Sequence, residues 1–333
     1  KQQMFPHLFN SLSVVIPVLS STFASVGRFL KHAGNMSLGM LIIDESGQAV
    51  PQSALGAIYR TRRAVVVGDP LQVEPVVTIP KVLIDILADS TCVANAYKVI
   101  ENSVQTFSDN INEFNGMIGE RQVGCPLVVH RRCIEPMFSI SNLISYVNRM
   151  FNKTNKKEEY LKPENLFLIK KSGWINVEGE ENGGKDHFVK NQAERVCQLM
   201  EDAVHIYSDL FGTDDKIFII TPFRTVAESM RKFIISYFSV KGYDKQILSK
   251  WTKNCVGTVH TFQGKDANEV LLVLGCSNKS AGAMNWVVKK ANILNVACTR
   301  AKYRIAFIGN INDWKNRRYF REFIPSFIDI INV

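Results

Sequence analysis

Short apolar runs alternate along the chain with longer stretches in which apolar and polar residues recur at helical spacing. This alternation is typical of parallel strands joined by crossover helices. In the N-terminal part we expect strands at 13–19, 40–44 and 64–69. In the C-terminal part we expect them at 174–177, 216–221, 256–259, 270–275 and 303–309. The pattern therefore predicts an α/β protein built on parallel sheets.

The amphipathic stretches predict helices at 131–149, 188–210, 224–238 and 285–301. The polar segment 151–165 and the glycine-rich segment 178–186 are interpreted as surface loops. A chain of 333 residues is long enough for two domains, and the pattern changes within 110–124. We therefore predict a first domain over 1–115 and a second over 116–333.

Charge is unevenly distributed along the chain. The formal net charge is +9, yet residues 1–116 hold 8 Lys and Arg against 9 Asp and Glu, and residues 117–333 hold 32 against 22. A basic second half favours a polyanionic partner, although a solvated lysine-rich surface would look the same. The seven cysteines form no C-x-x-C pair, which favours reduced thiols and a cytoplasmic location. No apolar run is long enough to span a membrane.

Two acidic residues end the apolar run "LIIDESGQ", where Asp44 and Glu45 follow three aliphatic residues. In an α/β sheet, ligands collect at the carboxyl ends of the strands, so this pair could hold Mg²⁺ and orient a water molecule. The same letters also fit the start of a helix. A second strand ends in "GDPLQ", which places Asp69 and Gln72 where an amide could contact a phosphate oxygen.

These two segments together resemble motifs II and III of superfamily 1 helicases, in the subgroup that includes the nonsense-mediated-decay helicase. Further segments match that family in the same order. "SSTFASVGR" resembles motif Ic, "LVVHRRCIEPMFSISNLISY" the motif IV region, "VGTVHTFQGKDANEVLLVLGCS" motif V and "LNVACTRAKYRIAFIGN" motif VI. The resemblance covers most of the chain and implies two RecA-like domains, of which the first is truncated.

The resemblance also implies roles for individual residues. Asp44 would bind Mg²⁺, Glu45 would act as the acid–base residue in ATP hydrolysis, and Gln72 would sense the γ-phosphate. Arg132 and Arg300 would act as arginine fingers, because guanidinium groups stabilise charge on a transferring phosphoryl group. The remaining positions would shape the nucleotide site (Asp69, Gln263, Gly264 and Asp266) or contact nucleic acid (Ser21, Thr22, Thr258 and Thr261).

No phosphate-binding loop precedes "LIIDESGQ" in the sequence. The string Gly179–Asp186 fits G-x-x-x-x-G-K but ends in an acid and lies in the second half, so we interpret it as an unrelated loop. We expect the true loop upstream of Lys1, an exposed apolar edge in the first domain, and little ATP turnover by these 333 residues alone.

The resulting hypothesis is part of an ATP-dependent helicase that moves 5′→3′ on single-stranded nucleic acid, with DNA favoured over RNA. ATP and Mg²⁺ would be its cofactors, bound in the cleft between the two domains. Two alternatives stay open: an RNA helicase, and an inactive scaffold that keeps the helicase fold and binds nucleic acid. The sequence does not indicate the oligomeric state.

Overall fold

The computed structural model describes residues 4–94, 97–98, 100, 102–119, 121–154, 167–183, 185–207, 209–262 and 264–331. The chain divides into two compact units, Lys1–Pro126 and Leu127–Val333. Segment 116–126 lies in the first unit, where the hairpin of β3 and β4 packs against α5. The predicted boundary between the two domains, at 115/116, stays a prediction.

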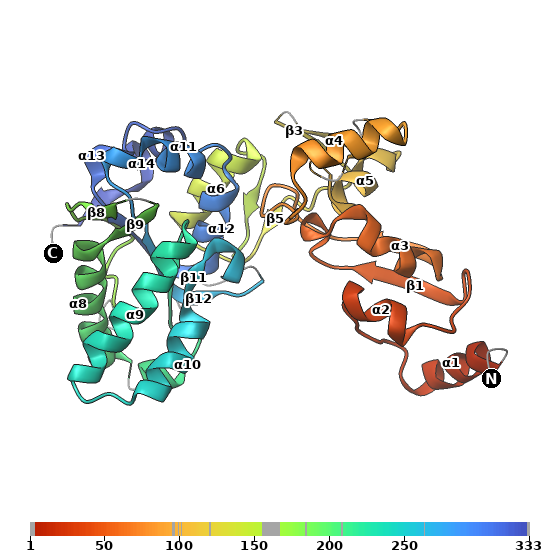
Figure 1. Cartoon of the computed structure of the whole chain (residues 1–333), viewed down its shortest axis with the longest axis horizontal. Helices are drawn as coiled ribbons and strands as arrows, with labels where there is room; N and C mark the ends of the chain where they lie inside the picture. Colours follow the sequence, from red (N-terminus) through yellow and green to blue (C-terminus); the bar gives the residue numbers. More distant parts are fainter. Residues whose placement is uncertain are drawn as a thin grey trace. The chain divides into compact units, whose positions relative to one another are not determined.

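The first unit is built around two parallel strands, β1 and β2, which pair from Leu38↔Thr61 to Ile43↔Val66. A small core forms beneath them, where Ile43, Ala54 and Val104 are buried together. Its elements, from orange-red to yellow in Figure 1, are α1 (Phe5–Val15), α2 (Phe23–Phe29), β1 (Leu38–Ile43), the 3-10 helix η2 (Ser46–Gln48), α3 (Pro51–Tyr59), β2 (Thr61–Val66), α4 (Lys81–Ser90), α5 (Val104–Ile111), β3 (Gly116–Ile118) and β4 (Arg121–Val123).

The expected strands at 40–44 and 64–69 are confirmed as β1 and β2, and the expected strand at 13–19 is wrong. Residues 13–15 end helix α1, where the Ser13 hydroxyl donates to the Phe9 carbonyl one turn earlier, and 16–22 have no regular structure. Valine-rich sequence favours a strand only beside a partner strand, and the described residues place none next to 13–19. On β1, Met40 and Ile42 are 57% and 67% exposed, and the expected apolar edge stays a prediction.

The second unit is organised by one six-stranded parallel sheet in the order β11-β10-β12-β13-β7-β14. Its elements are β5 (Val129–His130), α6 (Met137–Tyr146), β6 (Phe151–Asn152), β7 (Gly173–Asn176), β8 (Glu181–Gly183), β9 (Asp186–Val189), α8 (Lys190–Ile206), η5 (Leu210–Gly212), β10 (Ile217–Thr221), α9 (Arg224–Val240), α10 (Lys245–Cys255), β11 (Val256–Thr258), η6 (Val259–Phe262), β12 (Ala267–Val273), η7 (Asn278–Ser280), α11 (Ala281–Val287), α12 (Asn292–Arg300), β13 (Ala301–Gly309), α13 (Ile311–Trp314), α14 (Phe320–Phe327) and β14 (Asp329–Ile330).

Helices cover both faces of this sheet, as Figure 1 shows. Helices α8 and α9 pack together, and α9 lies along β10 and β11; α6 and α12 pack together on the side of β12 and β13. The inner strands β10, β12 and β13 are nearly all buried, which explains their unbroken aliphatic sequences. The expected α/β class built on parallel strands is therefore confirmed.

Most expected elements of the second unit are present with small shifts, and three expectations need correction. The helix expected over 131–149 is shorter, because α6 begins at Met137 after a proline. The helix expected over 285–301 is two helices, α11 and α12. The loop expected over 178–186 contains the antiparallel pair β8–β9, so Gly179–Asp186 does not form the strand–loop–helix of a phosphate-binding loop. Most of 151–165 lies outside the described residues.

Candidate functional site

Asp44 and Glu45 lie on a sharply turned segment that follows β1. We call this segment the DE loop (44–48). The Asp44 side chain is exposed, and its Oδ1 accepts the backbone N–H of Glu45 at 2.9 Å. Glu45 is half-buried and adopts the left-handed conformation with φ 52°. A non-glycine residue takes this conformation only when its surroundings enforce it. The loop therefore holds the Asp44 carboxylate and the Glu45 backbone at the strand end.

The segment after β2, which we call the GD loop (68–72), packs backbone against backbone on the DE loop. The Ser46 N–H donates to the Val67 carbonyl at 3.0 Å, and the Val67 N–H donates to the Ile43 carbonyl at 2.8 Å. A Cβ added to Gly68 would lie 2.6 Å from Ser46 Oγ and 2.8 Å from the Gly47 backbone nitrogen. Only glycine fits this approach, so the sequence brings the two predicted motifs into direct contact.

We expect Gly68→Ala to displace the DE loop and to weaken the first unit by about 2 kcal/mol, because an added methyl group there is overpacked against backbone. Amide hydrogen exchange at Val66 and Val67 measures this local loss. Gly39→Ala in β1 is the matched control, since its Cβ would meet nothing within 4 Å. Equal exchange rates in the two variants would contradict the close approach.

Within the GD loop, Asp69 holds its neighbours in place. Its carboxylate oxygens accept the Leu71 N–H and the Gln72 side-chain amide, both at 2.9 Å. Arg121 supports the same loop, because its guanidinium donates to the Pro70 carbonyl at 2.8 Å and to Thr106 Oγ1 at 3.0 Å. Burial lowers the pKa of Arg121, while the charges of Glu74, Asp109 and Asp69 oppose that effect. Asp69 and Gln72 therefore form a preorganised pair beside the DE loop.

A buried polar chain runs from the DE loop into α5. The Ser46 hydroxyl donates to Gln105 Oε1 at 2.5 Å, and Gln105 Nε2 donates to Asp109 Oδ1 at 2.7 Å. The Gly124 N–H also donates to Asp109 Oδ1, at 3.1 Å. The sequence does not reveal this chain or Arg121, because the bonds of Ser46, Gly124 and Arg121 join residues that are 15 to 59 positions apart and no periodic pattern marks them.

In the second unit, Arg132 lies in the segment that precedes α6. Cys133 is buried, and its backbone N–H donates to His130 Nε2 at 2.9 Å. Burial and the charge of Arg132 lower the pKa of His130 to about 4, so this imidazole is neutral at pH 7. Among the described residues the half-buried Arg132 side chain has no hydrogen-bond or ion-pair partner. It remains available for an anion.

Arg300, at the end of α12, is fully buried beneath the segment 262–266. Its Nη1 donates to the carbonyls of Phe262 at 3.3 Å and Lys265 at 3.0 Å. Next to it, Asp266 forms an ion pair with Lys302 at 2.7 Å. These contacts show Arg300 holding the loop; its expected role as an arginine finger stays a prediction.

The other expected contacts are at exposed or half-buried positions. Thr258 Oγ1 lies 3.4 Å from Thr261 Oγ1, and Gly264 is exposed with φ +77°. Gln263 lies outside the described residues. Ser21 and Thr22 are exposed immediately before α2. The structure thus brings Asp44, Glu45, Asp69 and Gln72 together in the first unit, and it brings Arg300 and Asp266 to the same loop in the second; the assigned roles stay predictions.

The donor set of the first unit fits a magnesium nucleotide. Magnesium prefers oxygen ligands and is usually held by one or two carboxylates, with phosphates and water completing the shell. Asp44 offers an exposed carboxylate at a strand end, with Glu45 adjacent and the Gln72 amide on the neighbouring loop.

The helices of the described residues are all too short or too polar to span a membrane.

Comparison with known proteins identifies the family. Two family models, each described as an AAA domain, match residues 2–79 and 114–312, and the second match alone covers more than half of the chain. The complex of Arterivirus nonstructural protein 10 (helicase) with DNA is a similar solved structure, with a TM-score of 0.38 and 12% identity over 86% of this chain and 42% of that chain.

Two curated relatives match nearly the whole chain. Probable helicase senataxin of Mus musculus is 22% identical over 328 residues, which are 95% of this chain and 11% of that protein. Regulator of nonsense transcripts 1 homolog of Arabidopsis thaliana is 25% identical over 294 residues, 86% of this chain and 21% of that protein. The chain thus spans well under half the length of these relatives. It carries AAA domains and belongs to the superfamily 1 helicases of the group that includes senataxin and the nonsense-mediated-decay helicase.

Proposed function

We propose that this chain forms part of an ATP-driven helicase that acts on single-stranded nucleic acid. The observation that carries the proposal is the packing of the DE loop on the GD loop, which gathers Asp44, Glu45 and Gln72 at the ends of two parallel strands. Ligands in α/β proteins collect at this position. The family membership supports helicase activity, and nucleotide use follows from it.

The chemistry of each residue follows from its surroundings. Asp44 would hold Mg²⁺, which neutralises charge on the phosphate oxygens when it is bound. Glu45, adjacent to Asp44 on the same turn, would orient the attacking water and accept its proton. The Gln72 amide, held at 2.9 Å from Asp69, would report whether a γ-phosphate oxygen is present. Arg132 and Arg300 stay the proposed arginine fingers.

The nucleic-acid partner follows from charge. Residues 117–333 carry ten more basic than acidic groups, and Thr258 and Thr261 offer hydroxyls at a half-buried and an exposed position of the second unit. Such a surface tracks phosphates without reading sequence. We propose single-stranded DNA as the substrate and 5′→3′ movement; RNA is the alternative. A cytoplasmic location also stays a proposal.

The proposal is tested by measuring ATP turnover of the gene product that carries this chain. The measurement is made with and without single-stranded oligonucleotide. We expect stimulation by nucleic acid and a loss of about 100-fold in Glu45→Gln, because a positioned general base contributes at least that factor. Glu113→Gln, an exposed carboxylate of the same unit, is the matched control. Nucleic-acid binding without turnover would favour the scaffold alternative instead.

Binding of matched DNA and RNA oligonucleotides, measured at several salt concentrations, distinguishes the two substrates. A steep loss of affinity with salt is expected for either, since phosphate contacts release counterions. Tighter binding of DNA would support our proposal. Equal affinity, or tighter binding of RNA, would contradict the choice of DNA.

A further inference from the structure

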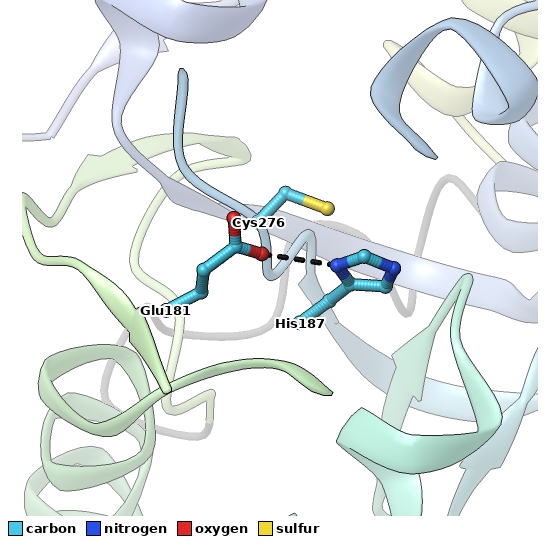
Figure 2. A group of neighbouring side chains, drawn as sticks. All are labelled: Glu181, His187 and Cys276. Atoms are coloured by element: carbon cyan, nitrogen blue, oxygen red, sulfur yellow. Dashed lines mark hydrogen bonds and ion pairs between the residues drawn. The ribbon is translucent and has the colours of Figure 1, made fainter. Parts of the chain in front are cut away.

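Three side chains of metal-binding type converge in the second unit, away from the residues discussed above. Glu181 lies in β8, His187 in β9, and Cys276 follows β12, and Figure 2 shows the three side chains directed toward one another. One ligand atom from each lies within 4.8 Å of the other two. We propose that Glu181, His187 and Cys276 bind a Zn²⁺ ion, which fastens the β8–β9 hairpin to the segment after the central strand β12.

The distances suit a tetrahedral ion after small adjustments. Zinc bonds of about 2.0 to 2.3 Å place neighbouring ligand atoms about 3.5 Å apart. Glu181 Oε2 and His187 Nδ1 are now 3.0 Å apart and share a hydrogen bond. On binding, both atoms would turn toward the ion, so two metal bonds replace that one hydrogen bond. Water would complete the fourth position, since the His187 side chain is 17% exposed and the site is therefore open to solvent on one side.

The groups around the three ligands hold them in position. Glu181 Oε1 accepts the hydroxyls of Ser280 at 2.5 Å and Ser277 at 3.3 Å. The His187 ring packs on Phe223, with centroids 4.7 Å apart. Ligand residues of metal sites are typically oriented by hydrogen bonds and packing of this kind.

The backbone at Cys276 is the second, independent observation. Gly275 and Cys276 are consecutive left-handed residues, with φ 61° and 58°. A Cβ on Gly275 would lie 2.8 Å from the His187 carbonyl, and the Cys276 N–H donates to that same carbonyl at 2.9 Å. The chain thus curls around His187 at a conformational cost for Cys276. Such strain persists where the surrounding structure, or a function, requires it.

The donor set favours zinc over magnesium and calcium. A thiolate and an imidazole suit Zn²⁺ and disfavour Mg²⁺ and Ca²⁺, which prefer oxygen alone. A thiolate and a carboxylate also balance the two charges of the ion within a buried site, where an unbalanced charge is costly. The proposal is independent of ATP hydrolysis, because Glu45 and Gln72 belong to the other unit.

Cobalt titration of the metal-free chain, under anaerobic reducing conditions, tests the site. We expect one equivalent of Co²⁺ to produce the near-ultraviolet charge-transfer band of a cobalt–thiolate bond. Zn²⁺ should then displace the cobalt with an apparent Kd below about 1 µM. Cys276→Ser should abolish the band, and Glu181→Gln, which keeps the size of the side chain, should weaken binding at least about tenfold.

Cys197→Ser is the matched control, because Cys197 is equally buried in the same unit but lies in α8. It should bind cobalt like the parent. A band that survives Cys276→Ser would come from another thiol, such as the exposed Cys92 or Cys125, and would overturn the assignment. Absence of any band in the folded parent would show that the cluster is only a hydrogen-bonded Glu–His pair beside a thiol.

Discussion

Glu269→Ala is expected to lower the free energy of unfolding of the second unit by about 4 kcal/mol near pH 5, because it leaves buried donors without acceptors. Glu269 is fully buried in β12. Its carboxylate accepts the backbone N–H groups of Leu168 at 2.8 Å and Ile169 at 2.6 Å. It also accepts the Tyr207 hydroxyl at 2.5 Å. One side chain thus connects the central sheet to two surrounding segments.

The effect of this substitution should depend on pH in a defined direction. Burial raises the pKa of Glu269 from 4.5 to about 7, although the hydrogen bonds from Tyr207 and the two backbone groups oppose the rise. A raised folded-state pKa gives stability that is fully present below pH 4.5 and is lost as the pH rises through 7. The shift corresponds to about 3 kcal/mol. The difference between parent and Glu269→Ala should therefore shrink from pH 5 to pH 8.

Urea unfolding followed by tryptophan fluorescence measures the second unit selectively, because all four tryptophans lie within 127–333. Glu228→Ala, an exposed glutamate of α9 paired with Arg224 at 2.9 Å, is the control and should change stability by less than about 1 kcal/mol. A difference that grows with pH would show the opposite balance, with the three donors outweighing burial and the pKa depressed.

The sequence predicted an element correctly where burial alone produced its residue pattern, and it failed where tertiary contacts determined the element. The strands β12 and β13 are buried on both faces, so their aliphatic runs identified them directly. The break between α11 and α12 was missed, because apolar spacing continues across Lys289 and Lys290 although α11 ends at Val287. The β8–β9 hairpin was missed as well. Its sequence is rich in glycine and glutamate, and it is held by tertiary contacts such as Glu181 with Ser280.

Some residues of the candidate site could likewise be predicted from the sequence, and others could not. Adjacent residues such as Asp44 and Glu45 could be proposed from sequence, because they follow an expected strand and, together with "GDPLQ", resemble helicase motifs II and III. Arg121 and Gln105 could not, since an arginine at the start of a short strand and a glutamine in a helix are ordinary in sequence. Their contacts with Pro70 and Ser46 exist only after the chain has folded. A contact that links distant segments leaves no periodic signal in either one.

Arg300→Ala is expected to lower the free energy of unfolding of the second unit by about 3 kcal/mol. The substitution removes a fully buried side chain and leaves the carbonyls of Phe262 and Lys265 without its guanidinium donor. The loss should loosen the loop that carries Asp266. Tryptophan fluorescence in urea measures the loss, and Arg321→Ala, an exposed arginine of α14, is the matched control.

Arg300→Lys separates the structural role from the proposed catalytic one. Lysine keeps the charge and can reach one carbonyl, but it lacks the rigid fork that contacts two acceptors at once. We therefore expect a smaller loss of stability than in Arg300→Ala. If Arg300 is also an arginine finger, nucleic-acid-stimulated ATP turnover by the gene product should fall by about 1,000-fold in Arg300→Lys although the protein stays folded. Turnover that falls only in proportion to the unfolded fraction would leave Arg300 with the structural role alone.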